Sequence, residues 1–114
     1  MTHIYKIMTT GDWAEATRTG AFTGAEIDIR DGYIHLSTAE QVAETARLHF
    51  RGRVDLVLIG FEAEAFGDAL KWEPSRGGQL FPHVYGGLPA SAAVSATPAP
   101  LDAEGAPIVP PLAP

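Results

Sequence analysis

The sequence predicts an α+β fold with five or six short, mostly antiparallel strands and two main helices. Strand-like and helix-like segments alternate through the first half of the 114-residue chain. Short apolar segments in the second half are too closely spaced for helical crossovers, so we expect those strands to pair antiparallel. A hydrophobic share of 46 % is enough for a chain of this length to form one core.

The first strand and helix follow from the N-terminal pattern. Alternation of apolar and polar residues predicts a strand over 3–8. Thr9 or Thr10 can cap the short helix that follows, and Gly20 is suited to end it. Residues 21–31 are acidic and contain a glycine, so we expect a loop there.

The second strand leads directly into the second helix. We expect a strand over 32–37 whose alternate side chains point to opposite faces. The side chains on its polar face are Tyr33, His35 and Ser37. Ser37 and Glu40 fit a capping box, which predicts a helix from that point to Gly52. The apolar stripe of this helix is formed by Ala39, Val42, Ala43, Ala46 and Phe50.

Shorter signals fill the rest of the chain. The apolar run 54–60 is typical of a central strand covered on both faces. The helix before it allows a parallel pairing with the strand over 32–37. A single helical turn is expected over 62–66. Three more short strands are expected over 70–73, 82–85 and 92–96.

Charge and composition exclude several functional classes. Fourteen acidic against eight basic residues give a net charge of −6, which disfavours duplex nucleic acid as a partner. The absence of cysteine excludes disulfides, thiolate metal sites and cysteine nucleophiles. No segment resembles a signal peptide or a membrane span, so we expect a cytoplasmic protein without a membrane partner. The acids Asp28 and Asp31 are expected to be solvated loop charges.

Composition changes near the C-terminus. Four of the nine prolines lie between Pro107 and Pro114, and such a segment cannot form a helix or an inner strand. We therefore expect a single α+β domain over 1–102 and an extended, proline-rich tail over 103–114. The tail either lies on the domain through its apolar residues or frays like an ordinary terminus.

Two residues of the second strand are of chemical interest. His35 lies directly before the expected helix N-terminus, where unpaired N–H groups favour an anionic or polar ligand group. The alternative is a buried histidine that is bonded to the backbone. The capping role is sufficient to explain Ser37, and no GxSxG sequence supports a hydrolase triad.

The second half of the chain adds four candidates. Arg76 beside two glycines is suited to hold a phosphate or carboxylate, or it forms a surface pair with Glu73 in a hairpin turn. His83 and Tyr85 share one strand face, either as a pair that binds a ring or ribose or as core residues. The four histidines show no short metal-ligand spacing, so no metal site is expected.

Several of these segments form one recognisable pattern. They are Ile4–Ile7, Trp13, Asp31–Gln41, Asp55–Leu58, Trp72–Glu73, Arg76–Gly78 and Phe81–Gly86. Together they resemble a small bacterial family, domain of unknown function 952 (DUF952). The resemblance covers about residues 3–100 and leaves out the proline-rich tail.

This resemblance implies a fold related to that of ADP-ribosyltransferases, a split α+β sheet that holds NAD in a cleft. By this resemblance His35 is a candidate catalytic residue that contacts the adenosine side of NAD, and Ser37 helps to orient the dinucleotide. Glu73 is the candidate catalytic acid, which stabilises positive charge on the ribose as nicotinamide departs, and Arg76 meets the pyrophosphate. The remaining candidate ligand-binding residues are His83 and Tyr85.

Three functions are consistent with these observations. The first is an NAD-using transferase or glycohydrolase. The second is a non-catalytic binding module for an anionic small metabolite in the same cleft. The third is an interaction protein whose proline-rich tail docks a partner. We rank a small-molecule ligand in a cleft above interaction alone, on condition that the polar candidates of both halves converge on one hollow.

Overall fold

Two antiparallel sheets and a small two-stranded ladder form the structure, a computed structural model that describes residues 2–114 apart from the side chain of Arg76. The larger sheet has the order β4 (Ser37–Thr38), β1 (His3–Thr9), β5 (Leu56–Glu62) and β9 (Ala93–Pro98). The smaller sheet has the order β3 (Ile34–His35), β7 (Leu80–Val84) and β6 (Leu70–Pro74). The ladder joins β2 (Ala21–Phe22) to β8 (Leu88–Pro89).

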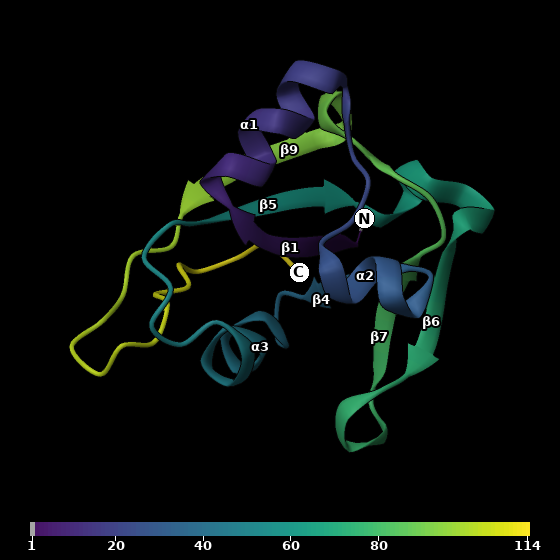
Figure 1. Ribbon diagram of the computed structural model, residues 1–114. Helices are drawn as coiled ribbons and strands as arrows, with labels where there is room; N and C mark the ends of the chain where they lie inside the picture. Colours follow the sequence, from purple (N-terminus) through teal and green to yellow (C-terminus); the bar gives the residue numbers. More distant parts are fainter. Residues whose placement is uncertain (1) are drawn as a thin grey trace.

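All strand pairs among the described residues are antiparallel, as Figure 1 shows for the larger sheet. The α+β class predicted from the sequence is therefore confirmed. The parallel pairing that the preceding helix allowed for the run 54–60 is not formed, because its strand β5 lies between β1 and β9 and runs antiparallel to both. The short strands expected in the second half of the chain are confirmed, with shifts of one to two residues at their ends.

Three α-helices and three 3₁₀-helices connect the described strands. The α-helices are α1 (Thr10–Thr19), α2 (Glu26–Asp31) and α3 (Val42–His49). The 3₁₀-helices are η1 (Ala63–Ala69), η2 (Arg76–Gly78) and η3 (Ala90–Ala92). Helix α1 has the predicted ends, since the Thr9 hydroxyl accepts the Asp12 amide N–H at 3.0 Å and Gly20 ends the helix with φ 107°.

Two predictions for the segment before α3 were wrong. Residues 21–31 form β2 and α2 instead of a loop. Ser37 does not cap a helix, because it pairs with Tyr5 as part of β4 and α3 begins only at Val42. The strand expected over 32–37 is divided at Leu36, so that β3 joins the smaller sheet and β4 joins the larger one.

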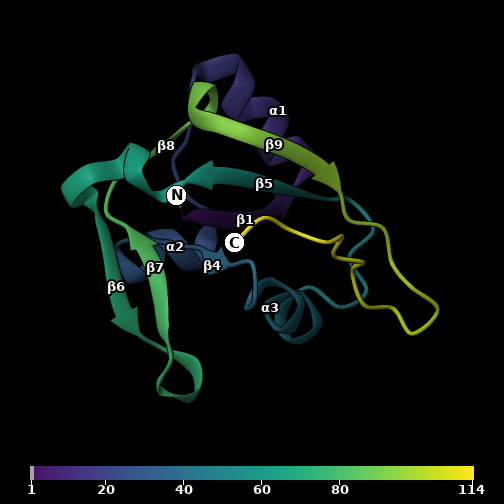
Figure 2. The same ribbon diagram turned by 180° about the vertical axis from the view of Figure 1, so that it is seen from behind.

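Both faces of the larger sheet are covered, as predicted for β5. On one face, α1 and the smaller sheet cover the alternate residues Ile4, Met8, Val57, Ile59 and Phe61. On the opposite face, α3 and the C-terminal tail cover Tyr5, Ile7, Leu56 and Leu58. Figures 1 and 2 show α1 and α3 on opposite sides of this sheet.

The C-terminal tail returns to the body and ends beside β1, as the yellow segment of Figure 2 shows. The Tyr5 hydroxyl donates a hydrogen bond of 2.6 Å to the Ala113 carbonyl. Val109 and Leu112 pack against the core on the α3 side, whereas Ile108 remains exposed. These contacts hold the tail without regular secondary structure.

Deletion of residues 107–114 is expected to lower the free energy of unfolding by about 1–3 kcal/mol. The deletion removes apolar contacts of Val109 and Leu112 and the hydrogen bond from Tyr5. Urea denaturation of the shortened and full chains measures this difference. Removal of Pro114 alone is the control, and equal stability of the full chain and the chain without 107–114 would contradict the prediction.

Candidate functional site

The register of the smaller sheet brings together polar residues from three separate parts of the sequence. His35 of β3 lies directly opposite His83 of β7, and their ring centroids are 5.5 Å apart, edge to face. Glu73 of β6 lies opposite Phe81, so it is the diagonal neighbour of His83. Opposite and diagonal side chains on one sheet face lie within contact range. The sheet therefore supports one polar cluster.

Glu73 binds both His83 and Tyr85. Its Oε1 lies 2.8 Å from His83 Nδ1 and accepts a hydrogen bond of 2.8 Å from the Tyr85 hydroxyl. The hydrogen bond from His83, and then that from Tyr85, lower the pKa of Glu73. The hydrogen bond to Glu73 raises the pKa of Tyr85. Glu73 is thus an ionised acceptor at neutral pH, and His83 Nδ1 is the donor to it.

The other nitrogen of His83, Nε2, is left with a lone pair when the ring is neutral. The residue is only 2 % exposed, and the part of the chain that the structure describes offers Nε2 no hydrogen-bond partner. His83 lines a pocket of about 320 Å³ between β1, β7 and α3. Such a volume lies at the lower end of the range for small-molecule sites, about 300–1,000 Å³. Nε2 is therefore the nitrogen of this pocket-lining ring that has no partner among the described residues.

The pocket has a polar and an apolar part. Its polar lining includes His35, Ser37, Thr45, His49, Ser75 and His83. Its apolar lining includes Ile7, Phe50 and Phe81. Ser37 is buried, and its hydroxyl lies 3.1 Å from that of Thr45. Hydroxyl groups and imidazoles beside aromatic rings suit a ligand that combines a ring with a sugar.

Both ring nitrogens of His35 bind carboxylates. Nδ1 lies 2.7 Å from Asp28 Oδ1, and Nε2 lies 2.9 Å from Asp31 Oδ2. Ionised carboxylates only accept hydrogen bonds, so each ring nitrogen that carries a proton donates to the carboxylate beside it. While both carboxylates stay bound, His35 therefore has no free ring nitrogen for a ligand. The helix N-terminus expected beside His35 is absent from this place, because β4 and a turn separate His35 from Val42.

Asp28 is a buried anchor of this site, which corrects the prediction of a solvated charge. It is 2 % exposed and accepts the backbone N–H groups of His35 and Ala25 at 3.0 and 2.8 Å. Burial alone raises the pKa of Asp28. The hydrogen bonds from His35 and the charge of Lys6 outweigh that effect, so the pKa lies well below its ordinary value of 3.8.

Lys6 is the cationic partner of Asp28 in the interior. It is 6 % exposed, and its Nζ lies 3.1 Å from Asp28 Oδ2 and donates to the His35 carbonyl at 2.9 Å. Burial lowers the pKa of Lys6, and the neighbouring Asp28 acts in the opposite direction. A lysine between Tyr5 and Ile7 of a buried strand needs an anionic partner in the interior. Lys6 was therefore the feature of the sequence that could have indicated a buried acid such as Asp28.

Tyr33 joins the parts of the cluster and was missed as a site residue. Its ring centroid lies 4.2 Å from that of His83, nearly parallel, and 4.7 Å from that of His35. It lies 5.3 Å from the Tyr85 ring. The period-two pattern placed Tyr33 on the same face as His35, but nothing in the sequence indicated that both histidines meet there.

The remaining predicted residues are placed as follows. Glu73 meets His83 but does not itself line the pocket. The side chain of Arg76 lies outside the described part of the structure. Within residues 2–114, no group of three or more His, Asp or Glu side chains is arranged to hold a metal ion. No helix in this range is long and apolar enough to span a membrane.

Solved structures of one bacterial protein, CC0527 from Caulobacter crescentus, are similar to this chain. Its crystal structure is 48 % identical in sequence, covers 94 % of each chain and has a TM-score of 0.92. The crystal structure of a double methionine variant gives the same values. Its solution NMR structure has a TM-score of 0.84 and covers 94 % of this chain and 92 % of that one.

No curated protein matches the chain. The family model described as "Protein of unknown function (DUF952)" matches residues 7–96, which is most of the chain. The segments that carried the resemblance in the sequence fall largely within this range. The chain therefore belongs to the DUF952 family.

Proposed function

We propose that the pocket binds NAD or a related nucleotide and that the protein transfers or hydrolyses its ADP-ribosyl group, on a fold related to that of ADP-ribosyltransferases. The observation that carries this proposal is the state of His83. Its ring is buried, Glu73 fixes its Nδ1, and its Nε2 is left for a ligand in a pocket that His35 and Ser37 also line. A histidine held in this way is suited to act as a general base.

The reaction needs one base and one leaving group. The bond between the nicotinamide nitrogen and ribose C1′ breaks, and its electron pair leaves with neutral nicotinamide. Water attacks C1′ and gives its proton to His83 Nε2, which yields ADP-ribose. In a transfer, the nucleophile of an acceptor replaces water. A general base of this kind contributes about 10²- to 10⁴-fold to the rate.

Glu73 acts through His83 in this proposal. When Nε2 takes the proton, the ring becomes an imidazolium, and the carboxylate 2.8 Å from Nδ1 stabilises that charge. This differs from the direct contact with ribose that the family resemblance implies, because Glu73 does not line the pocket. The Tyr85 hydroxyl also donates to this carboxylate, at 2.8 Å to Oε1 and 3.1 Å to Oε2.

The other candidate residues bind and orient the nucleotide. The ring of His35 and the apolar wall formed by Phe50 and Phe81 suit the base, and the Ser37 hydroxyl suits the ribose. Arg76, beside Gly77, is assigned to the pyrophosphate on the chemistry of its side chain. The pocket volume of about 320 Å³ suits one half of a dinucleotide, with the other half outside it.

The test is nicotinamide release from NAD by the pure protein and by Glu73→Gln, together with the effect of NAD on the melting temperature. We expect release by the wild type and a loss of roughly 100-fold in Glu73→Gln, because the amide cannot stabilise the imidazolium. Glu40→Gln, at an exposed position, is the control and is expected to retain activity. The absence of both nicotinamide release and thermal stabilisation by NAD would exclude the proposal.

A non-catalytic binding module for an anionic small metabolite is the second candidate. It is favoured by the engagement of both His35 nitrogens and by the absence of Glu73 from the residues that line the pocket. It predicts saturable binding that is weakened by His35→Ala or Arg76→Ala. Binding of NAD without nicotinamide release in the same assay selects this candidate.

A further inference from the structure

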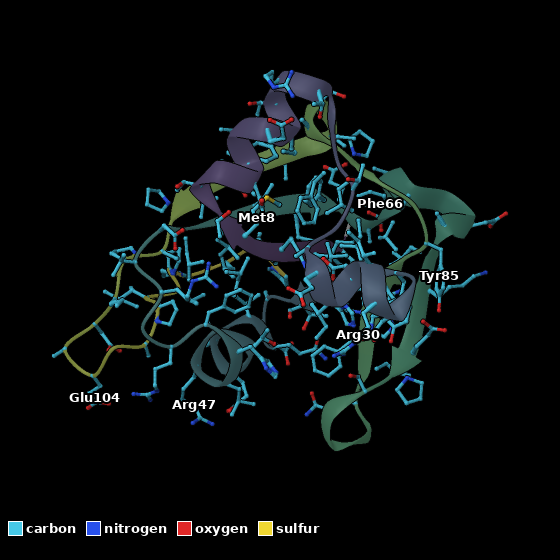
Figure 3. All side chains as sticks on the ribbon, in the orientation of Figure 1. Met8, Arg30, Arg47, Phe66, Tyr85 and Glu104 are labelled. Carbon is cyan, nitrogen blue, oxygen red and sulfur yellow. The ribbon has the colours of Figure 1, made fainter. Side chains whose placement is uncertain are left out.

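Asp31 connects the pocket histidine to an exposed arginine. One of its oxygens, Oδ2, lies 2.9 Å from His35 Nε2, and the other, Oδ1, lies 3.0 Å from Arg30 Nε. Two donors from α2 and β3 thus converge on one carboxylate. Figure 3 shows Arg30 at α2, the helix that also contributes Asp31. The arrangement is that of a small anion held between an imidazole and a guanidinium.

We propose that His35 Nε2 and Arg30 form an anion subsite beside the pocket, which the chain's own Asp31 carboxylate occupies until a phosphate or carboxylate group of the ligand replaces it. The inference rests on the proposed function in one respect, namely that His35 lines the ligand pocket. It assigns the place of the ligand's negative charge.

Asp31 is suited to be displaced, whereas Asp28 is not. Asp28 has a side chain that is 1 % exposed, and it is bound by Lys6, by the ring and backbone of His35, and by the Ala25 backbone. Asp31 has a side chain that is 28 % exposed, and the side chain of its partner Arg30 is 69 % exposed. Ion pairs at such positions contribute little net stability, so displacement of Asp31 costs the fold less than displacement of Asp28.

The position of Asp31 in its helix adds to this argument. It is the last residue of α2, directly before Gly32. The carbonyl groups at the end of a helix disfavour a negative charge. The helix therefore contributes nothing to holding this carboxylate, which is stabilised by His35 and Arg30. A ligand anion at the same two donors recovers both interactions.

One consequence is that Asp31 weakens the binding of small free anions. Any anion must compete with a carboxylate that is covalently tethered beside its partners, and such a tether gives a high effective concentration. A ligand that also contacts His83 and the apolar wall overcomes this competition. The subsite thus discriminates against isolated phosphate in favour of a phosphate that is attached to a larger molecule.

The experiment is a titration with inorganic phosphate, followed by NMR signals of the His35 ring. We expect the dissociation constant for phosphate to fall roughly tenfold in Asp31→Ala, because the competing carboxylate is gone. Asp31→Asn, which keeps the shape of the side chain, is also expected to lower the dissociation constant for phosphate. It replaces the alanine variant in the experiment if that variant is unstable. Asp68→Ala removes one exposed acid elsewhere and is expected to match the wild type.

The double variant Arg30→Ala with Asp31→Ala is expected to lose the increase in phosphate affinity, because one of the two donors to the anion is removed. Equal phosphate affinity of Asp31→Ala, Asp31→Asn and Asp68→Ala would overturn the proposal, as would a gain without any change at the His35 ring. This outcome is separate from that of the proposed function, because the titration contains no NAD. If nicotinamide is released but the Asp31 variants do not bind phosphate more tightly, only the subsite is excluded. If these variants bind phosphate more tightly but no nicotinamide is released, only the catalytic proposal is excluded.

Discussion

Replacement of Asp28 with asparagine is expected to lower the free energy of unfolding by about 3–5 kcal/mol. The change leaves Lys6 as an unpaired charge in the interior. Its Nζ lies 3.1 Å from an Asp28 oxygen, and the lysine is only 6 % exposed. It also weakens the hydrogen bonds that the His35 ring and backbone donate to Asp28. Urea denaturation, with the wild type measured in parallel, gives the difference.

Two further variants separate the buried charge from other effects. Asp68→Ala removes an exposed acid and is expected to change stability by less than about 0.5 kcal/mol. The double variant Lys6→Met with Asp28→Asn is expected to recover part of the loss, because no unpaired charge then remains in the interior. If Asp28→Asn proves as mild as Asp68→Ala, the buried ion pair does not anchor the site.

Asp28 also determines how stability responds to acid. Burial raises its pKa, but the hydrogen bonds from His35 and the charge of Lys6 lower the pKa further, to well below the ordinary 3.8. A depressed folded-state pKa contributes stability that is fully present above the unfolded-state value and is lost as the pH falls toward the folded-state value. Below about pH 4, the wild type is therefore expected to lose stability more steeply than Asp28→Asn.

The largest effect on activity is expected from His83→Gln. The glutamine amide can still hydrogen-bond to Glu73, but it cannot take a proton from the attacking nucleophile. We expect nicotinamide release to fall about 10²- to 10⁴-fold at saturating NAD, with a smaller change in NAD affinity. Initial rates over a range of NAD concentrations separate these two effects.

His49 provides the matched control for His83. It lines the same pocket from α3, but it is exposed, and neither a carboxylate nor the sheet fixes its ring among the described residues. His49→Gln is expected to retain the wild-type rate. Equal rates for His83→Gln and His49→Gln would show that the buried imidazole has no part in the reaction.

The sequence predicted the faces of individual strands better than the way in which strands meet. Alternation placed His35 with Tyr33, and it placed His83 with Tyr85, because the period of two is a local property. Their convergence depends on the pairing of His35 with His83 between β3 and β7. That register is set by the packing of the whole chain and has no local signal.

The errors had a similar physical origin. Ser37 and Glu40 have the residue types of a capping box, yet the backbone of Ser37 pairs with Tyr5 in the larger sheet. Long-range pairing thus replaced a local preference. Asp28 was expected in solvent because the acidic, glycine-containing segment 21–31 was predicted to be a loop, although Asp28 is bound to Lys6, a residue 22 positions away. Only the unexplained lysine in an apolar strand indicated such a partner.

The most direct test of the account is a long-range ¹H–¹⁵N NMR spectrum of the histidine side chains, recorded with and without NAD. The account predicts that the neutral ring of His83 carries its proton on Nδ1, with Nε2 unprotonated, because Glu73 accepts from Nδ1. It also predicts that the Nε2 signal shifts when NAD binds. A proton on Nε2, or a His83 signal that NAD binding leaves unchanged, would contradict the assignment of this pocket as the functional site.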